Sequence, residues 1–257
     1  QPIDAVSIQG DLKIFEHPQD GEVGYVMIAD VAEGVGADYS AISVIKIDNK
    51  KYTQVAVYKN NMVTPLEYAH KIMEISKLYH DAYCLVESNS IGNQVLYILE
   101  SELEFKRLFY TKRENNKIVL ELCKTPKNKF GVRSTSSTKN LGCNRLKELV
   151  KQSVLKINSY DTFEELTNFA SNGKTFQASS GCTDDLVMTL VLFAWLNIQP
   201  SFKEYETEIV KDSKNLTFNQ HLPPTLPIIT AISPLGEEGF VDADNNVWIE
   251  VGKNSFR

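Results

Sequence analysis

The sequence predicts an α/β fold, in which helices flank a central mixed β-sheet and a C-terminal β-hairpin extension follows. Short apolar runs rich in β-branched residues alternate with segments of helical periodicity. Several of these runs end at an acidic residue or a turn signal. The length of 257 residues and the apolar fraction of 42% suit one large core with an appendage.

The first half of the chain predicts a three-stranded meander followed by a crossover. A lead-in over residues 1–24 holds one short strand, and the meander strands are expected over residues 25–30, 41–47 and 52–58. Thr64-Pro65 opens a helix, because it supplies an N-cap and a proline at the first helical position. The apolar face of that helix is expected to contain Leu66, Ala69, Ile72, Met73 and Ile75.

A short strand ending at Glu87 comes next, followed by a helix over 92–102 and a strand over 107–110. This order is typical of a crossover between parallel strands. A hairpin is then expected over 112–122, with its turn at Asn115-Asn116.

The second half of the chain predicts two further helices. The helix over 140–155 is expected to turn four side chains inward, those of Leu141, Leu146, Leu149 and Val150. Residues 174–178 are strand-like, and 186–196 form a helix that is apolar nearly all round. One or two hairpins are expected over 228–251, with a turn at Asp244-Asn245-Asn246.

The predicted element order is that of the ribonuclease H-like fold. Three antiparallel strands come first, parallel strands follow, and a final helix carries acid at its N-terminus. In that fold the first strand, the fourth strand and the last helix bring their acids together. The chain is therefore divided into a lead-in (1–24), a ribonuclease H-like domain (25–200) and a C-terminal linker with β-hairpins (201–257).

Composition limits the class of function. The net charge of −6 argues against a dedicated nucleic-acid binder, but not against an enzyme to which DNA is delivered. The four cysteines form no CxxC pair, so reduced thiols are expected and a structural zinc is not. No apolar stretch is long enough to predict a membrane span or a membrane partner. The first residue is Gln1 rather than Met, so we expect a fragment or a processed product.

Acidic residues stand where buried elements end or begin. Asp30 ends one apolar run, Glu87 ends another, and Asp184-Asp185 precede the last helix. Singly, each has an ordinary explanation as a turn residue or as a helix-start charge. For the segment after Glu87, Ser90 as the N-cap of the next helix is one such explanation. Together they predict a site of carboxylate oxygens for Mg²⁺ or Mn²⁺.

The chemistry that this site predicts is phosphodiester hydrolysis with two metal ions. Asp30 is the best candidate to bridge both ions, and Glu87 would hold one. Neighbouring residues on a helix point about 100° apart, so Asp185 is preferred as the third ligand, with Asp184 as the alternative. Asp38 and Glu33 follow Asp30 closely and either support the ligands or are solvated turn acids.

A basic segment lies between residues 106 and 156. Such a segment is usually a solvated face, but here glycine and serine residues lie between the charges, which suggests a phosphate-gripping loop. The candidate DNA-binding residues are Lys112, Arg113, Lys127, Lys129, Arg133, Lys139 and Arg145.

Three motifs resemble the nuclease domain of the large terminase subunits of tailed bacteriophages, with the closest likeness to phages of the T-even type. The motifs are Ile28 to Gly34 with Asp38-Tyr39-Ser40, Glu87 to Gly92, and Gly181 to Met188. The likeness spans about residues 24–199. Many members carry His at the position of Thr183 and an acid at that of Met188, so the second of the two ions is expected to bind weakly.

The resemblance implies a nuclease that cuts concatemeric double-stranded DNA with low sequence specificity when headful packaging starts and ends. The implied partners are double-stranded DNA, an N-terminal packaging ATPase that this chain lacks, the portal protein and the small terminase subunit. The implied location is the host cytoplasm, at the procapsid. Two alternatives remain, a Holliday-junction resolvase-like or transposase-like nuclease and a non-catalytic domain that docks to the packaging motor.

Overall fold

The structure is a computed structural model that describes residues 1–21, 23–32, 36, 38–115, 117–121, 129–171, 173 and 176–207, with the backbone of 231–232, 238–241 and 247–249. The chain divides into two compact units, Gln1–Lys214 and Asn215–Arg257. The boundaries that the sequence predicts at residues 24 and 200 stay predictions.

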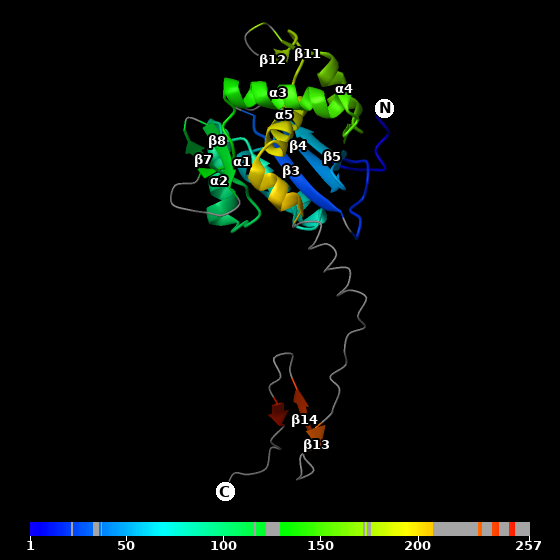
Figure 1. Ribbon diagram of the computed structural model, residues 1–257, viewed down its shortest axis with the longest axis vertical. Coiled ribbons are helices and arrows are strands. Elements are labelled where there is room, and N and C mark those ends of the chain that lie inside the picture. Colours follow the sequence, from blue (N-terminus) through cyan, green and yellow to red (C-terminus); the bar gives the residue numbers. More distant parts are fainter. Residues whose placement is uncertain are drawn as a thin grey trace. The chain divides into compact units, whose positions relative to one another are not determined.

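A mixed β-sheet forms the centre of the first unit (Figure 1). Its strands are β1 (Ser7–Gln9), β2 (Leu12–Ile14), β3 (Gly24–Asp30), β4 (Ser40–Asp48), β5 (Lys51–Asn60), β6 (Tyr83–Val86) and β10 (Leu155–Lys156). The order across the sheet is β1-β2-β5-β4-β3-β6, and β10 pairs with β5. Strands β3, β4 and β5 form the antiparallel meander, and β6 runs parallel to β3. The predicted mixed sheet is therefore confirmed.

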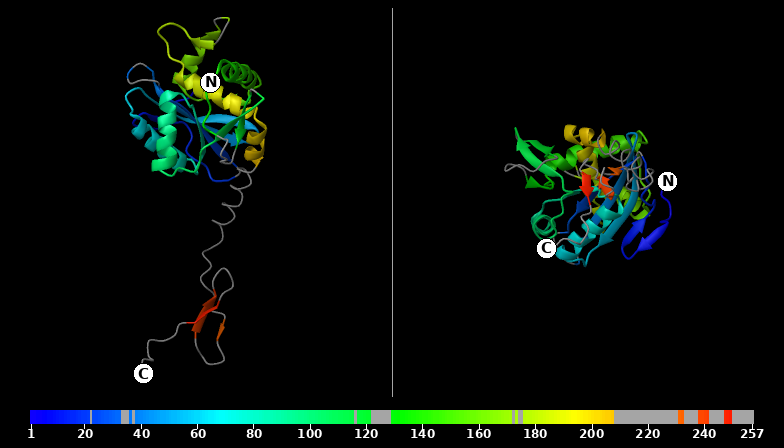
Figure 2. Two further views of the ribbon diagram at one scale, coloured as in Figure 1. Left: turned by 90° about the vertical axis from the view of Figure 1, so that its left-hand side faces the viewer. Right: turned by 90° about the horizontal axis from the view of Figure 1, so that it is seen from below.

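Helices cover both faces of this sheet (Figure 2, left). Helices α1 (Pro65–Leu78) and α2 (Ser90–Tyr97) share a core with Tyr25, Met27 and Ala29 of β3. Helices α3 (Ser136–Lys151) and α5 (Asp185–Asn197) share the opposite core with Val26 and Ile28.

This alternation along β3 decides where its last side chain goes. Successive side chains of a strand point to opposite faces, so Asp30 follows the set of Val26 and Ile28. The strand therefore directs the Asp30 carboxylate toward the layer that contains α5.

Helix α5 is buried along its whole length, as its unbroken apolar sequence predicts. It packs against β3 and β4 on one side and against α3 on the other. Gly142 of α3 lies so close to α5 that a Cβ atom there would stand 2.3 Å from the carbonyl oxygen of Val191. This close backbone contact joins α3 to the middle of α5.

Helix α1 begins at the predicted residue. Thr64 is its N-cap, and the Thr64 hydroxyl accepts a hydrogen bond from the Glu67 backbone N–H. The Glu67 carboxylate in turn accepts from the Thr64 backbone N–H at 2.9 Å, which completes a capping box. Leu66, predicted on the apolar face, is instead exposed, and Tyr68 is buried in that layer.

We expect Thr64→Ala to lower the free energy of unfolding by about 1 kcal/mol, because it removes the hydroxyl that accepts from the Glu67 N–H in the capping box. Leu66→Ala on the same helix is the matched control and is expected to change it little, since the Leu66 side chain is 47% exposed. Urea unfolding of both variants measures the difference. A larger effect for Leu66→Ala would contradict this account of the helix.

Other elements differ from their predicted bounds. Helix α2 begins at Ser90 with Asn89, not Ser90, as its N-cap, and it continues as a π-helix over Ile98–Glu102. The strand predicted over 107–110 is reduced to one parallel bridge between Leu108 and Cys84. The next hairpin begins two residues later, at Tyr110.

That hairpin is the predicted one, made of β7 (Tyr110–Glu114) and β8 (Lys117–Glu121), and β9 (Lys129–Phe130) pairs with β7. Helix α3 starts four residues before its predicted start, because Thr135 caps it. Of its four side chains predicted to face inward, Leu146 and Leu149 are buried, whereas Leu141 and Val150 are exposed.

The remaining elements of the first unit are short. They are α4 (Tyr160–Thr167) and a two-stranded sheet of β11 (Phe169–Ser171) and β12 (Phe176–Ala178). Before β3 the sequence predicts one strand, whereas the structure has two, β1 and β2, and both belong to the central sheet.

In the second unit, β13 (Ala231–Ile232), β14 (Glu238–Val241) and β15 (Val247–Ile249) pair antiparallel. The hairpins predicted over 228–251 are confirmed in these strands. The turn predicted at 244–246 lies outside the described residues.

No single helix among the described residues has the length and apolar character to cross a membrane. Helix α5 and the helical segment Pro200–Thr207 meet that criterion only when joined, and they are bent by 88°. The cysteines within the described ranges, Cys84, Cys143 and Cys182, are free thiols.

Candidate active site

The four carboxylates predicted as metal ligands line one cleft of about 610 Å³, namely Asp30, Glu87, Asp184 and Asp185. The cleft lies where β3 and β6 end and where α2 and α5 begin. Hydroxyl and amide side chains line it beside the acids, among them Ser88, Asn89, Ser90 and Asn93. The cleft is therefore rich in oxygen donors and carries an excess of negative charge.

Asp30 is the most deeply placed of the acids. It is the last residue of β3, and its side chain is buried in the layer of α5. The Tyr68 hydroxyl donates to its backbone carbonyl at 2.9 Å, which fixes the end of the strand. Burial, followed by hydrogen bonding and repulsion from Glu87, raises the pKa of Asp30 well above its usual range. Nearby charges of Asp185 and Asp184 raise this pKa further.

Glu87 follows β6 directly and is held by its backbone. Its N–H donates to the Ala29 carbonyl at 2.8 Å, and the residue bridges to Val132 in parallel register. On the other side Gly92 approaches so closely that a Cβ atom there would stand 2.0 Å from the Glu87 carbonyl oxygen. Backbone contacts on both sides place Glu87 opposite Asp30.

The two acids at the start of α5 have different surroundings. Asp184 is the N-cap residue, and its Oδ2 accepts from the Ala178 N–H at 3.3 Å. Asp185 is buried, and its Oδ1 accepts from the Tyr39 N–H at 3.3 Å. Its Oδ2 is buried without a hydrogen-bond partner among the described residues. Asp185 thus presents the oxygen that most needs a cation.

The protonation of Asp185 follows from this burial, which raises its pKa to about 6. The Lys59 ammonium opposes the shift, and the Glu165 carboxylate adds to it. A raised pKa means that the folded chain keeps this proton at a pH where the unfolded chain has released it. Asp185 therefore favours the folded state at low pH and loses that contribution as pH rises through about 6.

In the presence of a chelator, we expect Asp185→Asn to make the free energy of unfolding less dependent on pH between 4.5 and 7.5. The effect is about 1.4 kcal/mol for each unit of pKa shift that is removed. Urea unfolding at several pH values measures it, with the exposed Asp4→Asn as control. An unchanged pH slope in Asp185→Asn would refute this assignment.

The other two predicted acids are placed differently. Asp38 is exposed and lines the cleft. Glu33 lies outside the described residues, so its predicted role stays a prediction.

The predicted basic residues do not gather at one place. Arg133 lines the cleft, and the Lys139 ammonium lies 3.8 Å from Asp184 Oδ2. Lys112 is paired with Glu114 and Glu121 within the hairpin, at 3.1 and 2.5 Å. Of the predicted DNA-binding residues that the structure describes, only Arg133 and Lys139 are therefore brought to the acids.

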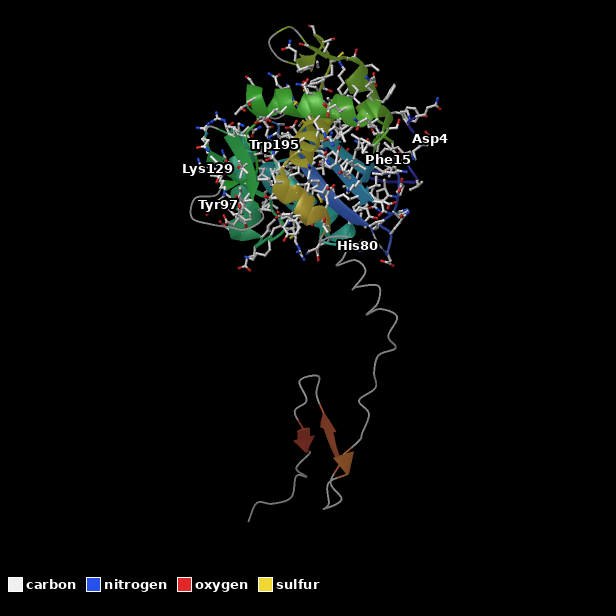
Figure 3. All side chains as sticks on the ribbon, in the orientation of Figure 1. Asp4, Phe15, His80, Tyr97, Lys129 and Trp195 are labelled. Carbon is white, nitrogen blue, oxygen red and sulfur yellow. The ribbon has the colours of Figure 1, made fainter. Side chains whose placement is uncertain are left out.

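The other members of the basic set lie away from the cleft. The Arg145 guanidinium donates to Asn197 Oδ1 at 2.9 and 3.0 Å, so it ties α3 to the end of α5. Arg113 and Lys129 are exposed on β7 and β9. Figure 3 shows Lys129 at the margin of the first unit, on the side of this hairpin. Lys127 lies outside the described residues.

Sequence reasoning misses two residues that contact the acids, and a third that pairs with one of them. Lys59 on β5 lies 3.7 Å from Asp185, Glu165 on α4 pairs with Lys59, and Tyr39 donates to Asp185. Tyr39 is part of the first motif, which is a usable signal. Lys59 and Glu165 are far from every motif in the sequence, so no pattern indicates them.

The ligand atoms that the four acids offer suit a divalent ion. They are all carboxylate oxygens, which suit Mg²⁺ and Mn²⁺. Asp185 Oδ2 accepts no hydrogen bond from the described residues, and burial together with the neighbouring acids raises the pKa of Asp30. Both carboxylates would therefore gain from a cation in the cleft. Among the described residues, no three Asp, Glu, His or Cys side chains are yet gathered at the spacing of a coordination sphere. The residues fit a divalent ion by chemistry and charge, and the side chains must rotate toward it.

The fold is shared with proteins of known structure. The large terminase nuclease of thermophilic phage G20c is 17% identical and covers 74% of this chain and 91% of its own, with a TM-score of 0.54. Its structure with bound magnesium, also 17% identical, covers 76% and 91% with a TM-score of 0.56. The large terminase nuclease domain of Thermus phage P74-26 is 19% identical and covers 74% and 88%, with a TM-score of 0.54.

A family model shows the family of this chain, which structures of such low sequence identity do not show by themselves. The model of the terminase RNaseH-like domain matches residues 27–199, which include all four carboxylates of the cleft. The predicted ribonuclease H-like fold is thereby confirmed, whereas the kinship to the T-even type stays a prediction. The chain belongs to the terminase RNaseH-like domain family.

Proposed function

We propose that this chain is the metal-dependent nuclease domain of a large terminase subunit, which cuts concatemeric double-stranded DNA with low sequence specificity. The observation that carries the proposal is the convergence of Asp30, Glu87, Asp184 and Asp185 on one cleft in a chain of this family. The bound magnesium of the G20c nuclease supports a divalent ion as the cofactor.

Two divalent ions about 3.5–4 Å apart would activate the attacking water and stabilise the leaving 3′ oxygen. Asp30 lies deepest and interacts with the other three acids, so it is the residue proposed to bridge the two positions. Glu87 and Asp185 would each hold one. Asp185 is favoured over Asp184 because its Oδ2 has no hydrogen-bond partner, whereas Asp184 Oδ2 accepts from Ala178.

The residues around Asp185 explain why the second metal ion is expected to bind weakly. Thr183, which stands where many relatives carry His, hydrogen-bonds to Glu165 and accepts from Lys59. Met188 is almost fully buried in the core shared with α3. Neither side chain offers a carboxylate or an imidazole, so we propose that the second ion binds more weakly than the first.

Arg133 and Lys139 are the residues proposed to hold the phosphate backbone near the reacting bond, because only they, of the predicted basic residues described, lie at the acids. Lys112 and Arg145 have carboxylate or amide partners of their own. With a net charge of −6, the chain is expected to bind DNA weakly by itself.

Weak binding of DNA is expected of an enzyme whose DNA is delivered to it by another protein or domain. We propose that a packaging ATPase domain, the portal protein and the small terminase subunit are its partners, and that it works in the host cytoplasm at the procapsid. Cuts at the start and end of headful packaging are the proposed role. Tight binding of duplex DNA by the isolated chain at physiological salt would contradict this part of the proposal.

The test is cleavage of supercoiled plasmid DNA with Mn²⁺, with Mg²⁺ and with EDTA. Nicked and linear products with either ion, and none with EDTA, are expected. A four-way junction of the same total length is the second substrate. Strong preference for it would favour the resolvase-like alternative, and no cleavage of either substrate would favour the non-catalytic docking domain.

A further inference from the structure

Lys59 occupies a position beside Asp185 that the proposed mechanism does not yet use. It lies near the end of β5, with its side chain mostly buried at 21% exposure. The Lys59 ammonium stands 3.7 Å from Asp185 Oδ2, the oxygen that has no hydrogen-bond partner. Lys59 therefore faces the carboxylate of a residue that lines the cleft.

The ammonium has little freedom to move. It donates to Glu165 Oε1 at 2.5 Å and to Thr183 Oγ1 at 2.8 Å. It also lies 4.4 Å from the centre of the Tyr39 ring, where a cation is attracted to the π-electrons. Strand β5, helix α4 and the loop before α5 thus meet at one charged group.

Glu165 is itself fixed at both oxygens. Its Oε2 accepts from the Val187 N–H of α5 at 3.0 Å, and its Oε1 accepts from Thr183 at 3.2 Å. These bonds join α4 to the first turn of α5, on either side of Asp185. Lys59 is therefore held in place by contacts at the start of α5, and the first turn of α5 carries the Asp185 carboxylate that Lys59 faces.

We propose that Lys59 is a positioning residue, whose ammonium, anchored by Glu165 and Thr183, holds the Asp185 carboxylate in the orientation required for metal binding. The Tyr39 N–H holds Oδ1, and Lys59 limits the rotation of Oδ2. The inference rests on the proposed function, because it assigns Lys59 to the metal ligand proposed there.

The charges around Lys59 indicate that its main effect is to orient Asp185. Repulsion between Lys59 and the metal ion is the smaller effect. Glu165 lies 2.5 Å from Lys59 and offsets its charge, so the pair adds little net charge to the cleft. Removing Lys59 alone leaves Glu165 uncompensated beside Asp185, which drives the two carboxylates apart. The expected consequence is a displaced Asp185 and weaker metal binding.

The experiment compares Lys59→Met with Lys13→Met. Lys13 is a matched control, because its ammonium also lies 2.5 Å from a carboxylate, that of Asp161, but does not contact the four acids of the cleft. Binding of Mn²⁺ to the protein without DNA is measured by electron paramagnetic resonance. The kcat and KM for plasmid cleavage are measured separately.

For Lys59→Met we expect the Kd for Mn²⁺ to rise about 10-fold to 100-fold, as when other partners of ligating side chains are removed. The kcat should fall at limiting Mn²⁺, while the KM for DNA and all values for Lys13→Met stay near wild type. Should Lys59→Met not fold, Thr183→Val removes one anchor of the ammonium and keeps its charge. It is then expected to raise the Kd for Mn²⁺ in the same direction.

Mn²⁺ binding by Lys59→Met that equals or exceeds that of wild type would overturn the inference. For Thr183→Val, an unchanged Kd for Mn²⁺ would do the same. A wild-type chain that binds no Mn²⁺ removes the proposed function and the inference together. If the wild-type chain binds Mn²⁺ and cleaves DNA, and Lys59→Met does so equally well, only the inference about Lys59 fails. The two failures are therefore distinguishable.

Discussion

Asp30→Asn is expected to lower the rate of metal-dependent plasmid cleavage by about 100-fold to 1000-fold or more, the size of effect seen when one preorganised charge-stabilising group is lost. Asp30 lies at the centre of the acids and is affected by Glu87, Asp185 and Asp184. The amide keeps the shape of the side chain but removes the charge that a divalent ion needs. Glu87→Gln is expected to act in the same direction.

The same substitution should make the fold more stable without metal. Burial and Glu87 raise the pKa of Asp30, so its ionised form is costly in the folded chain, and the cost is largest at high pH. The melting temperature of Asp30→Asn in EDTA at pH 7.5 is therefore expected to exceed that of wild type. Asp161→Asn, outside the cleft, is the control for both measurements. Cleavage at the wild-type rate by a folded Asp30→Asn variant would show that Asp30 is not part of the active site.

The second large effect is expected from Gly92→Ala. A Cβ atom at residue 92 would stand 2.0 Å from the Glu87 carbonyl oxygen and 3.0 Å from Asn89 Oδ1. Because the first of these atoms is backbone, either α2 or the segment of Glu87 must move. Overpacking costs about 1–3 kcal/mol and exceeds the gain of about 1 kcal/mol from alanine's helix propensity. A contact of 2.0 Å with a backbone atom belongs to the upper end of that range, so we expect the free energy of unfolding to fall by about 2 kcal/mol.

Cleavage should fall as well, because the displaced segment carries a proposed metal ligand. Gln94→Ala, at an exposed position of the same helix, is the control and is expected to leave stability and cleavage near wild type. Urea unfolding and the plasmid assay measure the two effects. A Gly92→Ala variant as stable and active as wild type would mean that α2 has room to move away from Glu87.

The parts of the fold that sequence predicts well are those with local causes. Thr64-Pro65 marks the start of α1 because the cap and the proline act within one turn. The acids at 30, 87 and 185 are found because a carboxylate at the end of a buried run is costly unless it has a use. The apolar sequence of α5 predicts its burial in the same way.

The parts that sequence misses depend on contacts across the chain. Leu141 and Val150 are exposed because the close approach at Gly142 sets which side of α3 faces α5. Asn89 caps α2, rather than Ser90, while its amide also donates to the Val31 carbonyl at 2.6 Å. Lys59 and Glu165 meet across two layers, so neither residue carries a local signal of its partner.

The burial of α5 between α3 and the sheet has a consequence for the order of folding. The cleft needs side chains from β3, from the end of β6 and from the first turn of α5, which is the last long element of the first unit. Contacts so distant in sequence form late in folding. We therefore expect a nascent chain that ends before residue 185 to have its meander and no cleavage activity. If the proposed function holds, the chain would be unable to cut DNA while it is still on the ribosome, and would acquire its cleft only after synthesis has passed this helix.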